Sequence, residues 1–241
     1  MSHVYDLPLV TSLIYLAAAI APAAFLLRFI YQNDTIEKEP GRLLVSLLFG
    51  GVLAALAAMV LEWIGEDLLI PSLPIREGTA SAAIADAILV GISEEGAKLY
   101  FLKRRSWNQP AFNYRFDGVV YAVFVSLGFA AFENVIYVSQ YGLSIALSRA
   151  LLAIPAHLSF GVALGSYYGR AKVCDVYGDD AGTKFNLLHG FLSAASLHAF
   201  YDGCIMVNTG FSTLLFAVFV IVLFLSVYRR VKKESQQDYA I

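Results

Sequence analysis

Seven long stretches of mostly apolar residues occupy most of the sequence, and this pattern constrains the fold more than any other feature. A helix needs roughly 20 such residues to cross about 30 Å of hydrocarbon. The stretches lie at approximately 8–28, 43–65, 81–102, 118–140, 144–168, 186–208 and 211–228. We therefore expect an all-α, polytopic integral membrane bundle of about seven transmembrane helices, with residues 1–241 forming a single transmembrane domain.

The composition supports a membrane protein and excludes other classes. Hydrophobic residues make up 59% of the chain and charged residues 15%, whereas soluble domains have about 45–50% and about 25%. With 17 basic and 19 acidic residues the net charge is −2, so the chain lacks the strongly basic face that binds nucleic acid. We expect the lipid bilayer as its surroundings, and neither nucleic acid nor nucleotide as a partner.

Lys and Arg lie mainly in alternate connections between the stretches. Of the 17 basic residues, 14 lie in the segments after the first, third, fifth and seventh stretches, and Arg76 lies in a connection on the other side. The positive-inside rule then predicts an N-terminus outside and a C-terminus in the cytoplasm. Asp6 and no Lys or Arg precede the first stretch, so we expect that helix to be retained rather than cleaved as a signal peptide.

Several ionisable side chains interrupt the predicted membrane helices. A charge near the bilayer centre costs about 2.5–3.5 kcal/mol, so such residues normally face the bundle interior and are functional candidates. They are Asp86, Glu94, Glu95 and Lys98 in 81–102; Glu133 in 118–140; Arg149 and His157 in 144–168; and His189, His198 and Asp202 in 186–208. We expect Arg149 to be structural and His189 to lie near the cytoplasmic interface, away from His198.

Helical spacing groups some of these residues. Lys98 follows Glu94 by four positions and Glu95 by three, so one ammonium can contact both carboxylates. The pair either lets the helix insert with its charge compensated or leaves one carboxylate basic enough to take a proton from water. His198 and Asp202 are also four apart, which suits either an Asp that orients a His or two ligands for one metal ion.

The depth of these residues indicates a common site. With a rise of about 1.5 Å per residue, Glu94, Glu133, His157 and His198 reach similar levels in the middle or outer half of the membrane. Carboxylates and imidazoles together supply a general base and proton carriers, with oxyanion stabilisers or a bound metal completing the site. The pattern favours hydrolysis by activated water, with a catalytic core at about 81–208.

Three short motifs in this core resemble those of a known family. Glu94 to Lys98 fits EExxK, Phe129 to Glu133 fits FxxxE, and His198 to Asp202 fits HxxxD. Together with the runs 127–134 and 117–118, they resemble the PrsW family of intramembrane proteases over about residues 90–205. The family is similar to the wider group that contains the type II CAAX prenyl proteases and bacteriocin-processing enzymes.

The resemblance implies an integral membrane endopeptidase of a bacterial or archaeal cell membrane. Such an enzyme cuts a membrane-anchored protein, and the best-known family role is site-1 cleavage of an anti-sigma factor. Glu94 or Glu95 would activate water and Lys98 would pair with them, while Glu133, His198 and Asp202 would complete the site. We include His157, which follows the helix-bending Pro155, as a further member.

Both a divalent metal and a metal-free glutamate mechanism are compatible with this resemblance. Where the wider group often has His in the second motif and Asn in the third, this chain has Glu133 and Asp202. On charge alone the replacement favours a divalent metal such as zinc, for which the candidate ligands are Glu94, Glu133, His198 and Asp202.

Two other functions fit the same buried residues. A proton- or cation-coupled transporter uses intramembrane Glu, His and Asp, although the sequence has no internal repeat typical of many transporters. A non-catalytic scaffold would keep the polar residues as contacts between helices. Both alternatives predict that Glu94→Gln leaves proteolysis unaffected.

Overall fold

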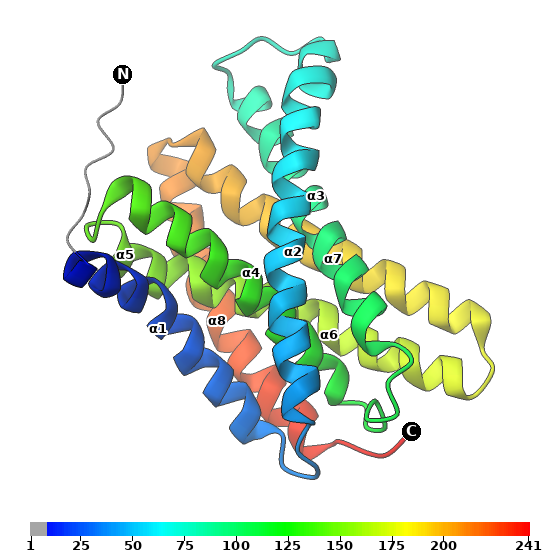
Figure 1. Cartoon of the computed structure of the whole chain (residues 1–241). Helices are drawn as coiled ribbons and strands as arrows, with labels where there is room; N and C mark the ends of the chain where they lie inside the picture. The colour runs from blue at the N-terminus through cyan, green and yellow to red at the C-terminus, as the bar shows by residue number, and fades with distance from the viewer. Residues whose placement is uncertain (1–8) are drawn as a thin grey trace.

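A computed structural model describes residues 9–241 as a bundle of long helices (Figure 1). The long helices are α1 (Leu9–Asn33), α2 (Gly41–Ile64), α3 (Ala80–Ser106), α4 (Asp117–Tyr141), α6 (Ile154–Val176), α7 (Asp180–Val207) and α8 (Gly210–Gln236). Shorter elements are the π-helix η1 (Gly65–Leu69), the 3₁₀-helix η2 (Ile70–Ser72), α5 (Ala146–Ser148) and the π-helix η3 (Arg149–Ala153). The all-α prediction is confirmed, while residue 8 of the first predicted stretch and Asp6 lie outside the described residues.

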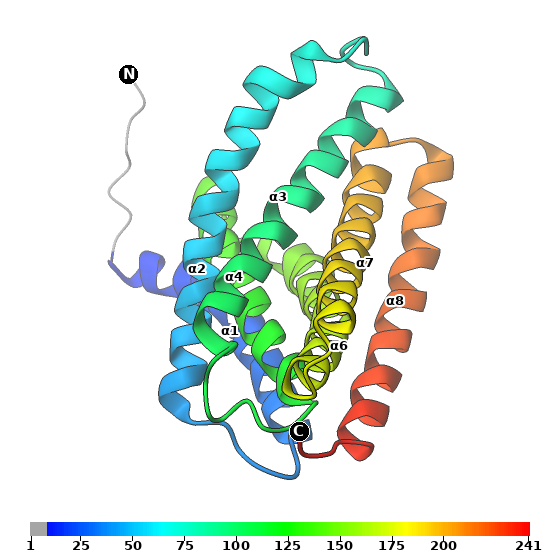
Figure 2. The same ribbon diagram turned by 90° about the vertical axis from the view of Figure 1, so that its right-hand side faces the viewer.

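Five segments of the described chain are long and apolar enough to cross a membrane by length and composition. They are Thr11–Asn33, Gly41–Ser72, Asp117–Tyr141, Ala146–Val176 and Gly210–Gln236. The remaining two long helices, α3 and α7, have 27 and 28 residues and run beside the others (Figure 2). The ionisable side chains of α3 and α7 lower the mean hydropathy of these two helices. The helices that carry most of the predicted site therefore fail to meet the criterion of length and composition.

Most helices extend beyond their predicted apolar stretches. α1 continues to Asn33, α7 begins at Asp180 and α8 continues to Gln236. The added turns include polar residues such as Gln32, Asn33 and Asp180, and the backbone hydrogen bonds of a helix can continue where the chain has left the hydrocarbon. Apolar length therefore marks the membrane-crossing part of each helix and underestimates the helix itself.

Helix α4 forms the centre of the bundle, packed against α1, α2 and α6. Glycine residues let α4 pack closely against two of these helices, α2 and α6. A Cβ at Gly51 of α2 would lie 2.1 Å from the Val125 carbonyl oxygen, and one at Gly118 would lie 2.4 Å from the Gly169 nitrogen of α6. Small residues let helices in a membrane pack backbone to backbone, and this places α2 and α6 on either side of α4.

The connection from α1 to α2 and the C-terminal segment meet at one end of the bundle, opposite the η1–η2 turn (Figure 1). Asp238 Oδ1 accepts a hydrogen bond from the Phe116 N–H at 2.8 Å, and the Tyr121 hydroxyl donates to Glu39. Burial raises the pKa of Glu39 to about 7 and that of Asp34 to about 6. Both carboxyl groups are therefore held in a less solvated setting than an ordinary loop provides.

Candidate active site

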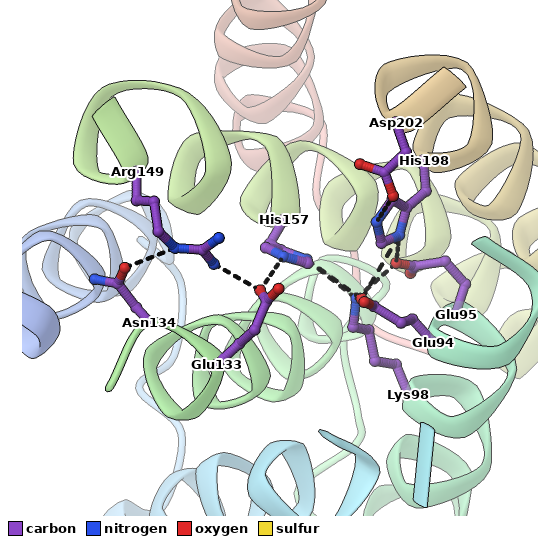
Figure 3. A network of polar contacts seen from close by, with 9 residues as sticks. All are labelled: Glu94, Glu95, Lys98, Glu133, Asn134, Arg149, His157, His198 and Asp202. Carbon is purple, nitrogen blue, oxygen red and sulfur yellow. Dashed lines mark hydrogen bonds and ion pairs between the residues drawn. The ribbon is translucent and has the colours of Figure 1, made fainter. Parts of the chain in front are cut away.

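The centre of the site is a buried lysine on α3 (Figure 3). Lys98 Nζ donates to Glu94 Oε2 at 3.0 Å and to Glu95 Oε1 at 2.7 Å, as its spacing predicts. The lysine and Glu95 are fully buried, and Glu94 is 6% exposed. The single ammonium therefore bridges both carboxylates, as expected from the sequence.

His157 on α6 joins the lysine to α4. Its Nδ1 lies 3.1 Å from Lys98 Nζ, and its Nε2 lies 3.0 Å from Glu133 Oε2. Because an ammonium can only donate, Nδ1 accepts its hydrogen bond and Nε2 is the atom that donates to Glu133. The contacts thus define one tautomer of His157.

His198 on α7 faces two carboxylates. Its Nδ1 lies 2.9 Å from Glu95 Oε1, and its Nε2 lies 3.3 Å from Asp202 Oδ2. Asp202 therefore contacts His198 at Nε2, as expected of an Asp that orients a His. The packing of the His198 ring on Phe160, with centroids 4.7 Å apart, further fixes its orientation.

Arg149, which was expected to be structural, joins this polar network through two residues of α4. Its Nη2 donates to Glu133 Oε2 at 2.8 Å, and its Nε donates to Asn134 Oδ1 at 2.8 Å. The arginine begins the π-helix η3, which precedes α6. An arginine in an apolar stretch indicates that its side chain has a polar partner inside the bundle. Hydropathy does not reveal which residue that partner is.

The predicted residues therefore converge from four helices. Glu94, Glu95, Lys98, Glu133, His157, His198 and Asp202 form one continuous set of contacts (Figure 3). His189 lies elsewhere, partly exposed on α7, with Nδ1 2.8 Å from the Phe185 carbonyl oxygen. The expectation that His189 is separate from His198 is consistent with this position.

The donor set is suitable for a divalent metal ion. One ligand atom from each of Glu94, Glu95, His157 and His198 lies within 4.8 Å of the others, and carboxylate oxygens and imidazole nitrogens are ligands that zinc accepts. Glu95 Oε2 is also buried without a hydrogen-bond partner among the described residues. In this structure the Lys98 ammonium supplies the positive charge among these donors.

The four predicted metal ligands divide into two kinds. Glu94 and His198 belong to the converging group, whereas Glu133 and Asp202 contact the imidazole Nε2 atoms of His157 and His198. Carboxylates in that position fix the ring orientation of metal-binding histidines.

A cavity of about 600 Å³ adjoins this network. Glu94, Glu133, His157, His198 and Asp202 line it, whereas Glu95 and Lys98 lie behind them. Glu62 of α2 also lines the cavity, although the sequence analysis did not single it out, because it lies near the end of an apolar stretch and belongs to none of the motifs. A substrate in the cavity would meet Glu94 before Glu95.

Fold and site together define a multi-pass membrane protein with a buried Glu/His site suited to hydrolysis. The sequence model described as PrsW family intramembrane metalloprotease matches residues 39–228. The chain belongs to this family of intramembrane proteases.

Named relatives match most of the chain. It is 32% identical to Protease PrsW of Halalkalibacterium halodurans over 225 residues, which cover 92% of this chain and 98% of the relative. It is 30% identical to Protease PrsW of Bacillus subtilis over 188 residues, which cover 78% and 80% respectively. No solved structure matches the chain. The protein is therefore an intramembrane peptidase, and transport is not favoured.

Proposed function

We propose that the protein hydrolyses a peptide bond within or beside the membrane-spanning segment of a membrane-anchored protein, with water activated by Glu94. The observation that supports this most is the convergence of Glu94, Glu95, His157 and His198 within 4.8 Å. One carboxylate and two imidazoles at the wall of a cavity, with a second carboxylate behind them, supply a base and proton carriers where bulk water is scarce.

Exposure to the cavity favours different roles for the two glutamates. Glu94 lines the cavity and takes the proton from water, then passes it to the leaving amine. Glu95 lies behind it, where it holds Lys98 and His198 in position. The Lys98 ammonium contacts both buried carboxylates and fixes their spacing.

Glu94, Glu95, His157 and His198 would hold a divalent ion, of which zinc suits the donor set. When bound, such an ion supplies a Lewis acid that polarises the peptide carbonyl and makes water more acidic. Glu133 and Asp202 orient the two imidazoles through their Nε2 atoms. Arg149 in turn holds Glu133.

The substrate is a membrane-anchored protein, and an anti-sigma factor cut at its first site fits the family role. A scissile peptide must unwind from a helix, because a helical backbone is already hydrogen-bonded and covered. We therefore expect helix-breaking residues near the cut. The bacterial relatives favour a bacterial or archaeal cell membrane. The basic loops favour an N-terminus outside and a C-terminus in the cytoplasm.

The proposal is tested with purified protein in liposomes and a panel of tagged single-span proteins that includes an anti-sigma factor. We expect one panel member to be cut in or beside its membrane segment. Cleavage should be lost when a chelator is added and restored when one divalent metal is supplied. Cleavage that persists when bound metal is below about one-tenth equivalent would contradict the metal site. Transport of a cation without any cleavage would contradict the protease site as a whole.

A further inference from the structure

A second cavity of about 140 Å³ lies between α2 and α4, beside the catalytic one. Six of its lining residues are apolar: Ala55, Ala58 and Met59 of α2, and Phe129, Phe132 and Ile136 of α4. Glu62, Glu94, Glu133 and Tyr137 line both cavities. The α2–α4 crevice, as we name this cavity, therefore leads from the side of the bundle to the carboxylates of the site.

The packing of the two helices explains why the crevice opens at one level. Gly51 of α2 lies directly against the backbone of Val125 and Gly128, and a Cβ at Gly128 would lie 2.3 Å from the Leu48 carbonyl oxygen. Beyond this contact α2 and α4 diverge toward their C-terminal ends (Figure 1). Met59 is 50% exposed and Tyr137 is 36% exposed on that divergent part, so lipid-facing side chains border the opening.

Glu62 lies where the crevice meets the catalytic cavity. Its Oε1 is inaccessible to solvent and has no hydrogen-bond partner among residues 9–241. A substrate helix that unwinds there exposes backbone N–H groups, each of which costs several kcal/mol in hydrocarbon if unpaired. The free carboxylate oxygen is an acceptor at the point where such N–H groups would first appear.

We propose that the transmembrane segment of the substrate enters sideways through the α2–α4 crevice and that Glu62 accepts hydrogen bonds from its unwound backbone. This inference rests on the proposed proteolysis. The occupant is an apolar membrane helix, because six of the residues that line the crevice are apolar and the other four line the catalytic cavity as well. Since about 140 Å³ holds little more than one side chain, α2 and α4 separate as the helix enters. Glu62 is a positioning residue here, since it holds the substrate without acting on the scissile bond.

Photocrosslinking tests the route. A benzophenone amino acid replaces Met59, or Val45 as the matched control, which lies on the same helix and is 65% exposed. The single-span protein cut in the liposome assay serves as the probe. We expect crosslinks at position 59 and none at position 45; equal crosslinking at both positions, or crosslinks at 45 alone, overturns the route.

Substitutions that narrow the crevice test whether the substrate passes through it. Met59→Trp combined with Ile136→Trp should lower kcat/KM for the single-span probe about tenfold, while cleavage of a short peptide of the same cut region in detergent changes less than about twofold. Val45→Trp should change neither rate. Unchanged cleavage of the single-span probe, or an equal loss for both substrates, overturns the proposal.

The role of Glu62 is tested by a conservative pair of variants. Glu62→Leu should raise KM for the single-span probe about tenfold, and Glu62→Gln, which keeps an acceptor oxygen, should restore it. A loss shared by Leu and Gln would contradict the acceptor role. Glu94→Gln separates this inference from the proposed function: its continued cleavage refutes the catalytic site, whereas its inactivity beside fully active crevice variants refutes the crevice alone.

Discussion

Lys98 makes the catalytic cluster compatible with the membrane interior. Its ammonium is buried between two glutamates and against His157. Removing one partner of such a group leaves unpaired charge in a medium that solvates it poorly. Loss of Lys98 should therefore lower the stability of the whole fold as well as disrupt the site.

Replacing Lys98 by Met should lower the free energy of unfolding by about 3–5 kcal/mol, because both glutamates lose their common partner. Lys103→Met, on an exposed position near the end of the same helix, is the control and should have little effect. Thermal unfolding in detergent measures both variants. Equal stability of the two would mean that the buried charge is compensated elsewhere.

Asp202 should act through His198. Asp202→Ala removes the carboxylate that faces Nε2, and we expect turnover to fall about 10–100-fold with KM less affected. Asp67→Ala, exposed on η1, serves as the control. Steady-state cleavage kinetics give both values, and an unchanged kcat would show that His198 needs no such orientation.

The residues of the three motifs were predictable because spacing along a helix fixes which side chains share a face. Two features of the site were not predictable from the sequence. Glu94 lines the cavity and Glu95 does not, which depends on the rotation of α3 set by close packing of Gly91 against Ala195 and Ala199 of α7. The contact of Arg149 with Glu133 depends on the π-helical turn η3, which has no hydropathy signal.

At the scale of helices, glycine contacts hold the bundle together where α2 and α4 cross. Gly51→Ala should lower the free energy of unfolding by about 1–3 kcal/mol, because the methyl group would overlap the α4 backbone. Gly41→Ala is the matched control, since a Cβ there meets nothing within 4 Å. Chemical unfolding of the two variants in detergent decides the point: similar stabilities would show that α2 can shift without cost.

The α1–α2 connection should weaken as the pH rises. Burial raises the pKa of Glu39 from 4.5 to about 7, so the folded state binds a proton more tightly than the unfolded state does. Its contribution to stability is full below pH 4.5 and is lost as the pH rises through about 7. Glu39→Gln should remove the Glu39 part of this dependence and leave that of Asp34, whose pKa burial raises to about 6.

Hydrogen exchange across residues 34–40, measured between pH 5 and 8 and corrected for intrinsic exchange, checks this expectation. Protection in the wild type should decrease over that range, and the decrease above about pH 6, the pKa of Asp34, should be smaller in the variant. Glu37→Gln, exposed in the same connection, is the control. Protection that increases with pH would contradict the sign of the shift.

The whole molecule arranges its helices by their polarity. The strongly apolar α1, α2 and α8 present large exposed hydrophobic surfaces, whereas the less apolar α3 and α7 pack closely together and carry the ionisable groups inward. Apolar length could predict the number of long helices, but it could not predict their neighbours. The close α2–α4 and α4–α6 contacts depend on glycines far apart in the sequence.

Cleavage by isosteric variants tests the central claim, that this buried cluster is the site of hydrolysis. The rate at which purified protein in liposomes cuts its single-span substrate would be compared among wild type, Glu94→Gln, Glu95→Gln and Glu77→Gln, the last exposed in the α2–α3 connection. We expect Glu94→Gln and Glu95→Gln to lose at least about a hundredfold in rate with the fold retained, and Glu77→Gln to match the wild type. Wild-type rates in both cluster variants would contradict the account.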